Sequence, residues 1–340
     1  MNKTILIAIP TFNRFDQIVQ LLKQLATLDK NVFDLVVIDN HSTDKRYIKE
    51  LPNVVKNLFP NDQAKLVRNK ANLGFSGNFL KCVEYATPYE WLWAIGDDDH
   101  LEESFEIASL EKEIKKAGED TAFITFSSEI GQVSKQLDTT YDSFSSVLEN
   151  VRFGNILLIS TVVYRLPRIA PHLAVGYQFS HSHCPHTAIL LRALSSENKL
   201  LASSLRPIVW NPSDHRIDED DALSGKQGIS TDVFYLLNVA CNFNERKLLY
   251  QALVGSYVTI GNVMAEALKT HPESNRMRIN WISHFCLNTL LWDCRIASKI
   301  GALLAFMLCH SERGLRFFLY LKRHAKKIFP RKVKTKNLRY

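Results

Sequence analysis

Apolar runs and amphipathic stretches alternate along the first 125 or so residues of the chain. Residues 4–9 form a continuous apolar run that ends at Pro10, as expected for a strand buried on both faces. Residues 16–28 repeat apolar side chains close to every 3.6 positions, which predicts a helix. Further strands are expected at 33–38, 65–68, 91–95 and 122–126, and further helices at 78–86 and 102–117. This alternation predicts an α/β domain with a mostly parallel sheet flanked by helices.

The rest of the chain follows a different pattern. Residues 127–230 mix polar stretches with short apolar ones and predict no clear order of elements. From residue 232 the pattern is helical, with breaks near Pro272 and Gly314. We therefore expect three parts: an α/β domain at 1–230, a helical region at 231–310 and a tail at 311–340.

Charge separates the tail from the body. The chain carries 42 Lys and Arg against 35 Asp and Glu, a net charge of +7. Residues 311–340 hold eleven bases and one acid, so the tail is +10 and the remainder −3. With 46% hydrophobic and 23% charged residues, the body has the composition of a folded enzyme, and intrinsic disorder is excluded.

Composition also bears on location. No run reaches the roughly 18–20 apolar residues that a membrane span needs. The apolar stretch before Pro10 is too short for a secretory signal, so we expect the protein to stay in the cytosol. The six cysteines show no C-x-x-C spacing, and reduced thiols are the expected state.

Polar clusters follow three of the predicted strands, at 10–14, 39–44 and 97–99. Ligands of open parallel sheets bind beyond the carboxyl ends of the strands, where these clusters fall. An acidic triplet alone is usually a solvated turn, but Asp97, Asp98 and Asp99 directly follow an apolar strand. Three adjacent carboxylates repel one another unless a cation lies among them, and hard ions such as Mg²⁺ or Mn²⁺ prefer carboxylate oxygen.

The usual nucleotide-binding motifs are missing. The sequence has no G-x-G-x-x-G after the first strand and no G-x-x-x-x-G-K-[ST], which weighs against a dinucleotide dehydrogenase and a P-loop NTPase. Asp39 is a candidate acceptor for a base or ribose, although turn and capping chemistry would also explain Asp39 and Asp44. Residues 72–78 offer flexible backbone at a helix start, with Ser76 as the expected N-cap.

Four motifs together resemble a known family. They are IPTFNR at 9–14, VIDNHSTD at 37–44, NLGFSGN at 72–78 and IGDDD at 95–99. Their order and spacing resemble a family 2 glycosyltransferase with the Rossmann-like GT-A fold, over roughly residues 3–130. The resemblance implies transfer of a sugar from a nucleotide-sugar donor to an acceptor hydroxyl, usually with inversion and with Mn²⁺ or Mg²⁺.

The resemblance also assigns residues to the donor site. The side chains expected to line the nucleotide pocket are Pro10, Thr11, Phe12 and Arg14, with Asp39 on the base and Asn72 and Gly74 beside the nucleotide. The acidic triplet corresponds to the D-x-D motif and fits it in either register. Asp97 and Asp98 are then expected at the donor, and Asp98 or Asp99 as the direct metal ligand.

The general base departs from the family pattern. The family usually places an Asp or Glu about 90 residues past the acidic motif, but residues 180–186 contain no carboxylate. His181, His183 and His186 are candidate bases because imidazole titrates near neutral pH. A transition-metal site made by these histidines with Cys184 is an alternative, as are roles in the acceptor pocket or in structure.

A second cluster, at 214–221, offers other candidates. The family often completes the metal shell with a late histidine, and His215 is the candidate here. Asp214 or Asp218 would alternatively be a displaced base. A solvated acidic loop is the competing interpretation, above all for the last three residues of the cluster.

The tail has its own pattern. On a helical wheel one side carries Phe317, Phe318, Leu321, Ala325, Ile328 and Phe329, and the other carries Arg316, Arg323, Lys326 and Lys327. Such a basic amphipathic helix predicts an anchor on an anionic membrane surface. Packing against the catalytic domain and nucleic-acid binding are the alternatives, and we expect no nucleic acid partner.

The leading interpretation is a metal-dependent, inverting glycosyltransferase. It would act on a lipid-linked or oligosaccharide acceptor, peripherally at the inner face of the plasma membrane, in synthesis of surface polysaccharide such as O-antigen or capsule. The alternatives are a sugar-nucleotide nucleotidyltransferase, disfavoured because residues 10–14 lack glycine, and a non-catalytic membrane-binding protein.

Overall fold

The computed structural model describes residues 4–128, 138–209, 233–256, 275–293, 295–308, 313–314, 316–318 and 320–321. Contacts divide the chain into two compact units, residues 1–257 and 258–340. Residues 233–256 therefore belong to the first unit. The boundaries predicted at 230 and 310 both lie outside the described residues and stay predictions.

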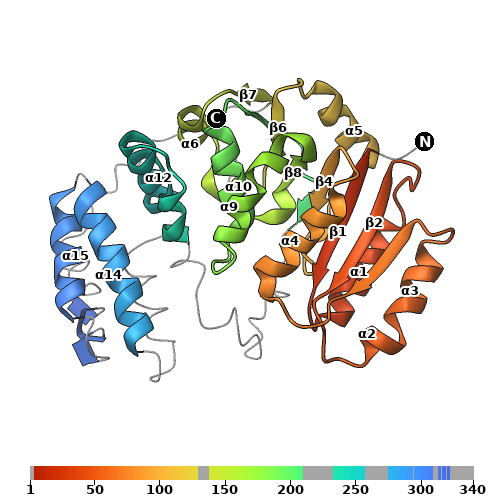
Figure 1. The fold of residues 1–340 in the computed structure, drawn as a ribbon, viewed down its shortest axis with the longest axis horizontal. Coiled ribbons are helices and arrows are strands. Elements are labelled where there is room, and N and C mark those ends of the chain that lie inside the picture. Colours follow the sequence, from red (N-terminus) through yellow and green to blue (C-terminus); the bar gives the residue numbers. More distant parts are fainter. Residues whose placement is uncertain are drawn as a thin grey trace. The chain divides into compact units, whose positions relative to one another are not determined.

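An eight-stranded sheet forms the centre of the first unit (Figure 1), in the order β3-β2-β1-β4-β8-β6-β9-β7. Its strands are β1 (Ile5–Thr11), β2 (Phe33–Asp39), β3 (Ala64–Arg68), β4 (Trp91–Ala94), β6 (Thr121–Thr125), β7 (Thr139–Tyr141), β8 (Val162–Arg165) and β9 (Lys199–Ala202). A small second sheet pairs β5 (His100–Leu101) with β10 (Ile208–Val209). The pairs β3-β2, β2-β1, β1-β4 and β6-β9 are parallel, so the predicted mostly parallel sheet is confirmed.

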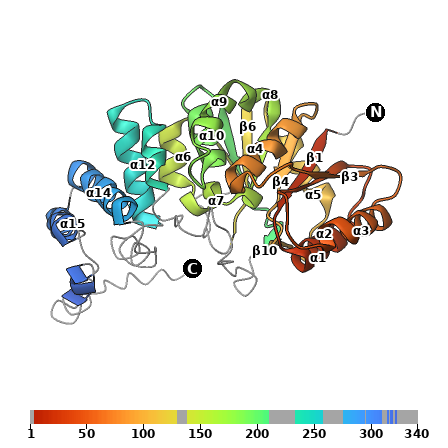
Figure 2. The ribbon, with the colours of Figure 1, turned by 60° about the horizontal axis from the view of Figure 1, so that its bottom comes forward.

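Helices cover both faces of this sheet (Figure 2). The helices of the first unit are α1 (Phe15–Leu25), α2 (Arg46–Lys49), α3 (Leu51–Leu58), α4 (Gly74–Ala86), α5 (Ile107–Lys116), α6 (Phe144–Asn150), α7 (Phe153–Leu157), α8 (Leu166–Ile169), α9 (Leu173–Gln178), α10 (Pro185–Leu194) and α12 (Phe243–Ser256). Short 3₁₀ turns lie at η1 (Ile159–Thr161), η2 (Ala170–His172) and η3 (Val233–Asn238).

The two-sided burial explains the continuous apolar runs. Every residue of β1 is buried, and alternate side chains point to opposite faces of the sheet. Ile5, Ile7 and Ile9 join one core with the apolar sides of α1, α3 and α5. On the other face, α4 packs against β1, β2 and β4. A central parallel strand with both faces covered has no need of polar positions.

The middle of the chain completes the sheet, which the sequence did not predict. β8 lies antiparallel between β4 and β6, and β9 lies between β6 and β7. These strands are only three or four residues long, too short to show a period. Long-range pairing therefore decides their structure.

The second unit contains α14 (Asn275–Trp292) and α15 (Ile296–Leu308), packed against each other as a pair. The connection between them turns at Asp293, whose Oδ1 accepts a hydrogen bond from the Arg295 backbone N–H at 2.8 Å. No helix among the residues that the structure describes is long and apolar enough to cross a membrane.

Candidate active site

The three polar clusters come together at the carboxyl edge of the parallel strands. The Thr11 end of β1 pairs with the Asp39 end of β2, and the Ile95 backbone N–H donates to the Ala8 carbonyl beside them. The segments that follow β1, β2 and β4 therefore leave the sheet next to one another. Ionic bonds and hydrogen bonds then connect these segments directly.

Arg14 is the cation among the acidic side chains. Its Nη1 lies 3.0 Å from Asp97 Oδ1 and 2.8 Å from Asp98 Oδ2. Both carboxylates are largely buried, whereas the arginine side chain is 30% exposed. One guanidinium thus offsets part of the repulsion between two adjacent carboxylates while keeping a side open to solvent.

Burial dominates the protonation of Asp97. Loss of hydration raises the pKa of Asp97 to about 6, against the opposing effect of the Arg14 guanidinium. The Phe12 backbone N–H also donates to Asp97 Oδ2, at 3.4 Å. Asp97 therefore connects the first polar cluster to the third.

Asp99 points to a different partner, the hydroxyl of Ser160 in η1. The same Ser160 Oγ accepts a hydrogen bond from the Gly96 backbone N–H at 2.8 Å. A Cβ added to Gly96 would lie 2.9 Å from Asp99 Oδ2 and 3.2 Å from Asp98 Oδ1. Two carboxylate oxygens from adjacent residues therefore lie on the same side of this glycine, and Asp99 Oδ2 is also the acceptor of the Ser160 hydroxyl. That donor set fits a hard divalent ion, which proteins often hold with one or two carboxylates while substrate phosphates complete the shell.

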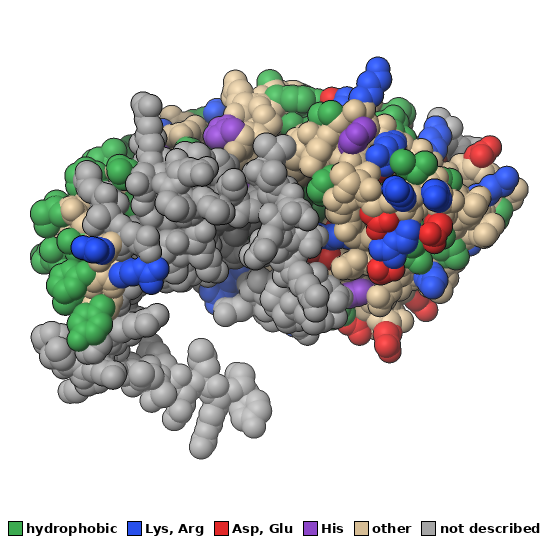
Figure 3. Space-filling model, turned by 90° about the horizontal axis from the view of Figure 1, so that it is seen from below, with side chains coloured by type: hydrophobic (Ala, Val, Ile, Leu, Met, Phe, Trp, Pro, Cys, Tyr) green, Lys and Arg blue, Asp and Glu red, His purple; other side chains and the backbone are tan. Residues whose placement is uncertain are grey.

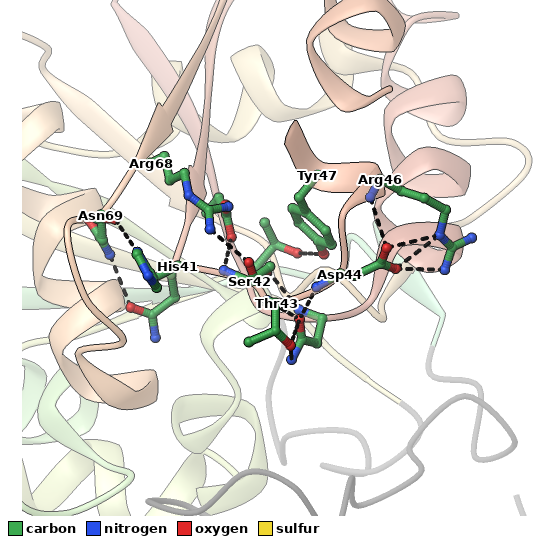
Figure 4. Close-up of polar contacts among 12 residues, drawn as sticks. His41, Ser42, Thr43, Asp44, Arg46, Tyr47, Arg68 and Asn69 are labelled. Carbon is green, nitrogen blue, oxygen red and sulfur yellow. Dashed lines mark hydrogen bonds and ion pairs between the residues drawn. The ribbon is translucent and has the colours of Figure 1, made fainter. Parts of the chain in front are cut away.

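The loop after β2 is fixed by buried polar contacts (Figure 4). Asp39 Oδ1 accepts from the Ser42 N–H at 2.9 Å, and Asp39 Oδ2 pairs with Arg68 at the end of β3. Arg68 also donates to the Ser42 carbonyl at 2.8 Å. Asp39 thus performs turn chemistry in this structure, and its contact with a nucleotide stays a prediction. The half-buried Asp44 pairs with Arg46, whose hydrogen bond lowers the pKa of that carboxyl.

Asn13 joins the first two loops. It adopts a left-handed backbone with φ of 54°, a conformation that asparagine tolerates better than most residues. Its side-chain oxygen accepts the backbone N–H of Thr43 at 2.8 Å, and its own N–H donates to Ser42 Oγ at 2.9 Å. Behind it, the buried Tyr47 hydroxyl bonds Thr11 Oγ1 at 2.6 Å and accepts the Arg14 N–H at 2.9 Å.

Asn40 holds the segment that contains Asn72 and Gly74. Its amide nitrogen donates to Asn72 Oδ1 at 2.7 Å and to the Gly74 carbonyl at 3.1 Å. Its oxygen accepts the Leu73 N–H at 2.9 Å. Asn40 is 3% exposed, so these bonds form in a water-poor setting and fix the shape of the loop firmly.

The start of α4 corrects one sequence expectation. The helix begins at Gly74, so Ser76 lies inside the first turn and is not the N-cap. The Ser76 hydroxyl instead donates to the Ser182 carbonyl. This bond joins the start of α4 to the loop that carries His181 and His183.

The three candidate histidines differ in their surroundings. His186 is 1% exposed, bonds the Leu157 carbonyl through Nε2 and packs edge-on against Phe75 and Phe79. Burial lowers the pKa of His186 to about 4, which keeps its ring neutral near pH 7. His181 is exposed and His183 half-buried, so these two are the more accessible candidates.

The remaining candidates are the residues of the second cluster and the alternative metal site. Asp214 and His215 lie in residues 210–232, outside the described residues, and stay predictions. Within the described ranges, no group of three or more His, Cys, Asp or Glu side chains is arranged to hold a metal ion. That finding includes the alternative cluster of His181, His183, His186 and Cys184.

Sequence reasoning missed several residues that build this site. Asn40 and Arg68 stand directly at strand ends, and that position was the available signal. Tyr47 and Ser160 gave no local signal, because only the fold carries their hydroxyl groups to Thr11 and Asp99.

Solved structures share this architecture. S. aureus TarS residues 1–349 in complex with UDP-GlcNAc aligns with a TM-score of 0.62 at 17% identity, covering 95% of this chain and 92% of that one. Mannosyltransferase PcManGT from Pyrobaculum calidifontis, in complex with GDP-Man and Mn²⁺, aligns with a TM-score of 0.52 at 10% identity, covering 97% and 88%. At such identities the likeness establishes the fold. No curated protein sequence matches the chain.

The sheet order and the likeness to these structures define an α/β protein with the GT-A fold. The model of glycosyl transferase family 2 matches residues 6–168, which contain all three polar clusters. The chain is a glycosyltransferase in which residues 6–168 match family 2.

Proposed function

We propose that this glycosyltransferase moves a sugar, with inversion, from a nucleotide-sugar donor to a hydroxyl of a glycan acceptor. One observation carries the proposal: Arg14, after β1, bridges Asp97 and Asp98 after β4, beside the Asp39 loop after β2. A donor diphosphate needs positive charge, and Arg14 provides it from a side that is open to solvent. UDP-GlcNAc and GDP-mannose, which the two similar structures contain, are the donors to test first.

A divalent ion, Mn²⁺ or Mg²⁺, belongs to this proposal. Asp98 and Asp99 would hold it, because Asp98 Oδ1 and Asp99 Oδ2 lie on the same side of Gly96. The ion would supply Lewis-acid stabilisation of the diphosphate leaving group. His215 remains the candidate for a further ligand.

The protein's own groups would prepare the donor for attack. Arg14 would orient the diphosphate by charge-assisted hydrogen bonds, and the Asn40 contacts would keep residues 72–74 in place beside the nucleotide. A general base would accept the proton of the attacking hydroxyl as the glycosidic bond forms. His183 and His181 suit this role better than the buried His186, and Asp214 remains a further candidate.

The acceptor and the cellular location complete the proposal. The +10 tail supports work at an anionic membrane surface on a lipid-linked or oligosaccharide acceptor, in synthesis of surface polysaccharide such as O-antigen or capsule. The peripheral inner-face location and the absence of a nucleic acid partner belong to the same proposal. Co-sedimentation with anionic vesicles of chains ending at 310 and at 340 tests the role of the tail.

A donor-hydrolysis panel tests the activity. The purified chain is incubated with nucleotide sugars of each base, with Mn²⁺, with Mg²⁺ and with EDTA, and the released nucleoside diphosphate is measured. We expect one donor class to be hydrolysed well above the others and only with metal. Release of pyrophosphate with formation of a nucleotide sugar would instead identify a nucleotidyltransferase.

Paired substitutions test the site. We expect Asp98→Ala with Asp99→Ala to lower donor turnover by about 100-fold or more, because groups that stabilise leaving-group charge contribute several kcal/mol. Glu102→Ala with Glu103→Ala removes the same charge from two adjacent exposed residues and is the matched control. Full, metal-dependent turnover in the first pair would show that the site assignment is wrong.

A further inference from the structure

The second unit exposes an unusual amount of apolar surface. Of the sixteen large hydrophobic side chains that are exposed in the described part of the chain, eleven lie between residues 287 and 321. They are Leu287, Leu291, Ile296, Ile300, Leu303, Leu304, Phe306, Met307, Phe317, Tyr320 and Leu321. Such a concentration marks an interaction surface, because scattered single hydrophobic residues would be ordinary.

The orientation of α15 produces this surface. Its small residues Ala302 and Ala305 are fully buried, and α15 packs against α14. Ile300, Leu303 and Met307 are 55%, 48% and 57% exposed, although their spacing is that of the core-facing side of a helix. The large apolar side of this helix therefore faces away from its own partner helix. We name the exposed side chains of α15 the α15 face.

The charged side chains next to the α15 face in the sequence are mainly basic. Lys299 lies in the first turn of α15, and Arg313 and Arg316 are exposed beyond its last turn. Residues 322–340 add nine Lys and Arg and no acid. Figure 3 shows the hydrophobic side chains of this unit grouped at the left with Lys and Arg beside them.

We propose that the α15 face inserts into the interface of an anionic lipid bilayer, with the neighbouring bases on the lipid headgroups. The helix has 13 residues and is about 20 Å long at ~1.5 Å per residue, shorter than the ~30 Å hydrocarbon core, so it would lie along the surface and not span it. Apolar insertion and electrostatic attraction then act on the same surface, the combination that stable peripheral binding requires. This inference deepens the proposed membrane association, and it assigns the apolar contact to α15 in addition to the tail.

The test uses the full-length chain and vesicles of phosphatidylglycerol with phosphatidylethanolamine, compared with phosphatidylcholine alone. The variant Ile300→Gln/Leu303→Gln/Met307→Gln keeps good helix formers while removing the apolar side chains. The matched control is Ile48→Gln/Tyr177→Gln/Phe243→Gln, at exposed apolar positions of the first unit. We expect the α15 variant to bind anionic vesicles at least about tenfold more weakly and the control to bind as the unaltered chain does.

A second measurement does not depend on removing apolar groups. Leu303→Trp keeps the face apolar, and its added tryptophan emission should shift to shorter wavelength on anionic vesicles. The unaltered chain and Tyr177→Trp serve as references, and the latter should show no added shift. Equal binding of the α15 variant and the unaltered chain, or no shift for Leu303→Trp, would overturn the inference.

Two other outcomes have distinct meanings. If the unaltered chain binds neither vesicle, the proposed membrane association itself fails, and the α15 inference fails with it. If sedimentation without lipid shows a dimer that the α15 variant abolishes, the face binds a second copy of the chain and the lipid proposal is wrong. Donor hydrolysis by the same variants reports separately on the transferase site.

Discussion

At the scale of single residues, the site is built by side chains that each connect two loops. Arg14 bridges two carboxylates, Asn13 bonds the loop after β2, and Asn40 fixes residues 72–74. The Arg14 and Asn40 contacts are partly buried and the Asn13 contact with Thr43 is exposed, so the first two are the more expensive to break. Two predictions follow from the surroundings of individual side chains.

The first concerns Arg14. Arg14→Gln removes the charge that offsets Asp97 and Asp98, and we expect kcat/KM for the donor to fall about 10- to 100-fold. Arg14→Lys retains a point charge and should keep part of the activity. The control Arg168→Gln removes an exposed ion pair with Asp120 and should change kcat/KM less than twofold. Unchanged kinetics for Arg14→Gln would contradict the role of Arg14 at the donor.

The second concerns the buried His186. Its pKa of about 4 in the folded chain lies below the ordinary value of 6.5, so the unfolded chain binds the proton more strongly. The free energy of unfolding is therefore not reduced by His186 above about pH 6.5, and it falls as the pH is lowered from 6.5 toward 4. The full loss is on the order of 3 kcal/mol.

Urea unfolding at pH 7 and pH 4.5 checks this pH dependence. His186→Gln retains a donor for the Leu157 carbonyl but has no titrating ring, so its stability should fall by about 2–3 kcal/mol less over this range. Equal losses in the two proteins would mean that His186 titrates normally in the folded chain.

At the scale of elements, the sequence predicted the main strands and helices up to residue 126, without α2, α3 and β5, and a helical pattern from residue 232. It did not predict the elements between these two parts. A long apolar run such as β1 and a strongly amphipathic helix such as α1 can be identified from the local sequence alone. β8 and β9 have four residues each, and their identity depends on pairing with β4 and β6. Such short strands carry too little local information to be predicted from sequence. The strands that were predicted include β1, β2 and β4, which the polar clusters follow.

Helix packing offers a prediction at this scale. α9 lies against α10, and a Cβ added at Gly176 would be 2.6 Å from Ile189 Cδ1 and 3.0 Å from Leu80 Cδ2. Ile189 is fully buried, so we expect Gly176→Ala to lower the free energy of unfolding by about 1–3 kcal/mol.

Gly301→Ala is the matched control for this substitution. A Cβ at Gly301 in α15 meets no atom of the described chain within 4 Å, and alanine favours helix, so stability should be unchanged or rise by up to about 1 kcal/mol. Both values come from urea unfolding curves. A neutral result for Gly176→Ala would show that the α9–α10 contact relaxes.

At the scale of the whole molecule, charge and apolar surface are segregated along the chain. The proposed donor site lies in residues 1–257, and the α15 face and the basic tail lie in 258–340. The two units thus divide the transferase chemistry from the proposed membrane contact.

Salt concentration should affect vesicle binding and donor hydrolysis differently. Raising NaCl from about 0.05 M to about 0.5 M shortens the Debye length from ~14 Å to ~4 Å. Binding to anionic vesicles should weaken at least about tenfold, because it uses exposed bases, whereas donor hydrolysis in solution should change less than about threefold. Co-sedimentation and nucleotide release on the same preparation measure both, and salt-insensitive vesicle binding would contradict an electrostatic contribution of the tail.

The sequence by itself determined the α/β class, the strand ends that carry polar residues, the family and the charge of the tail. These properties are local: they depend on period, on spacing and on the order of residues along the chain. The tertiary structure decided that Arg14 is the cation among the aspartates, that Asn40 and Ser160 belong to the site and that His186 is buried. It also decided that α15 turns its large apolar side outward. Those contacts join positions about 30 to 80 residues apart, and only the folded chain brings such positions within hydrogen-bonding distance.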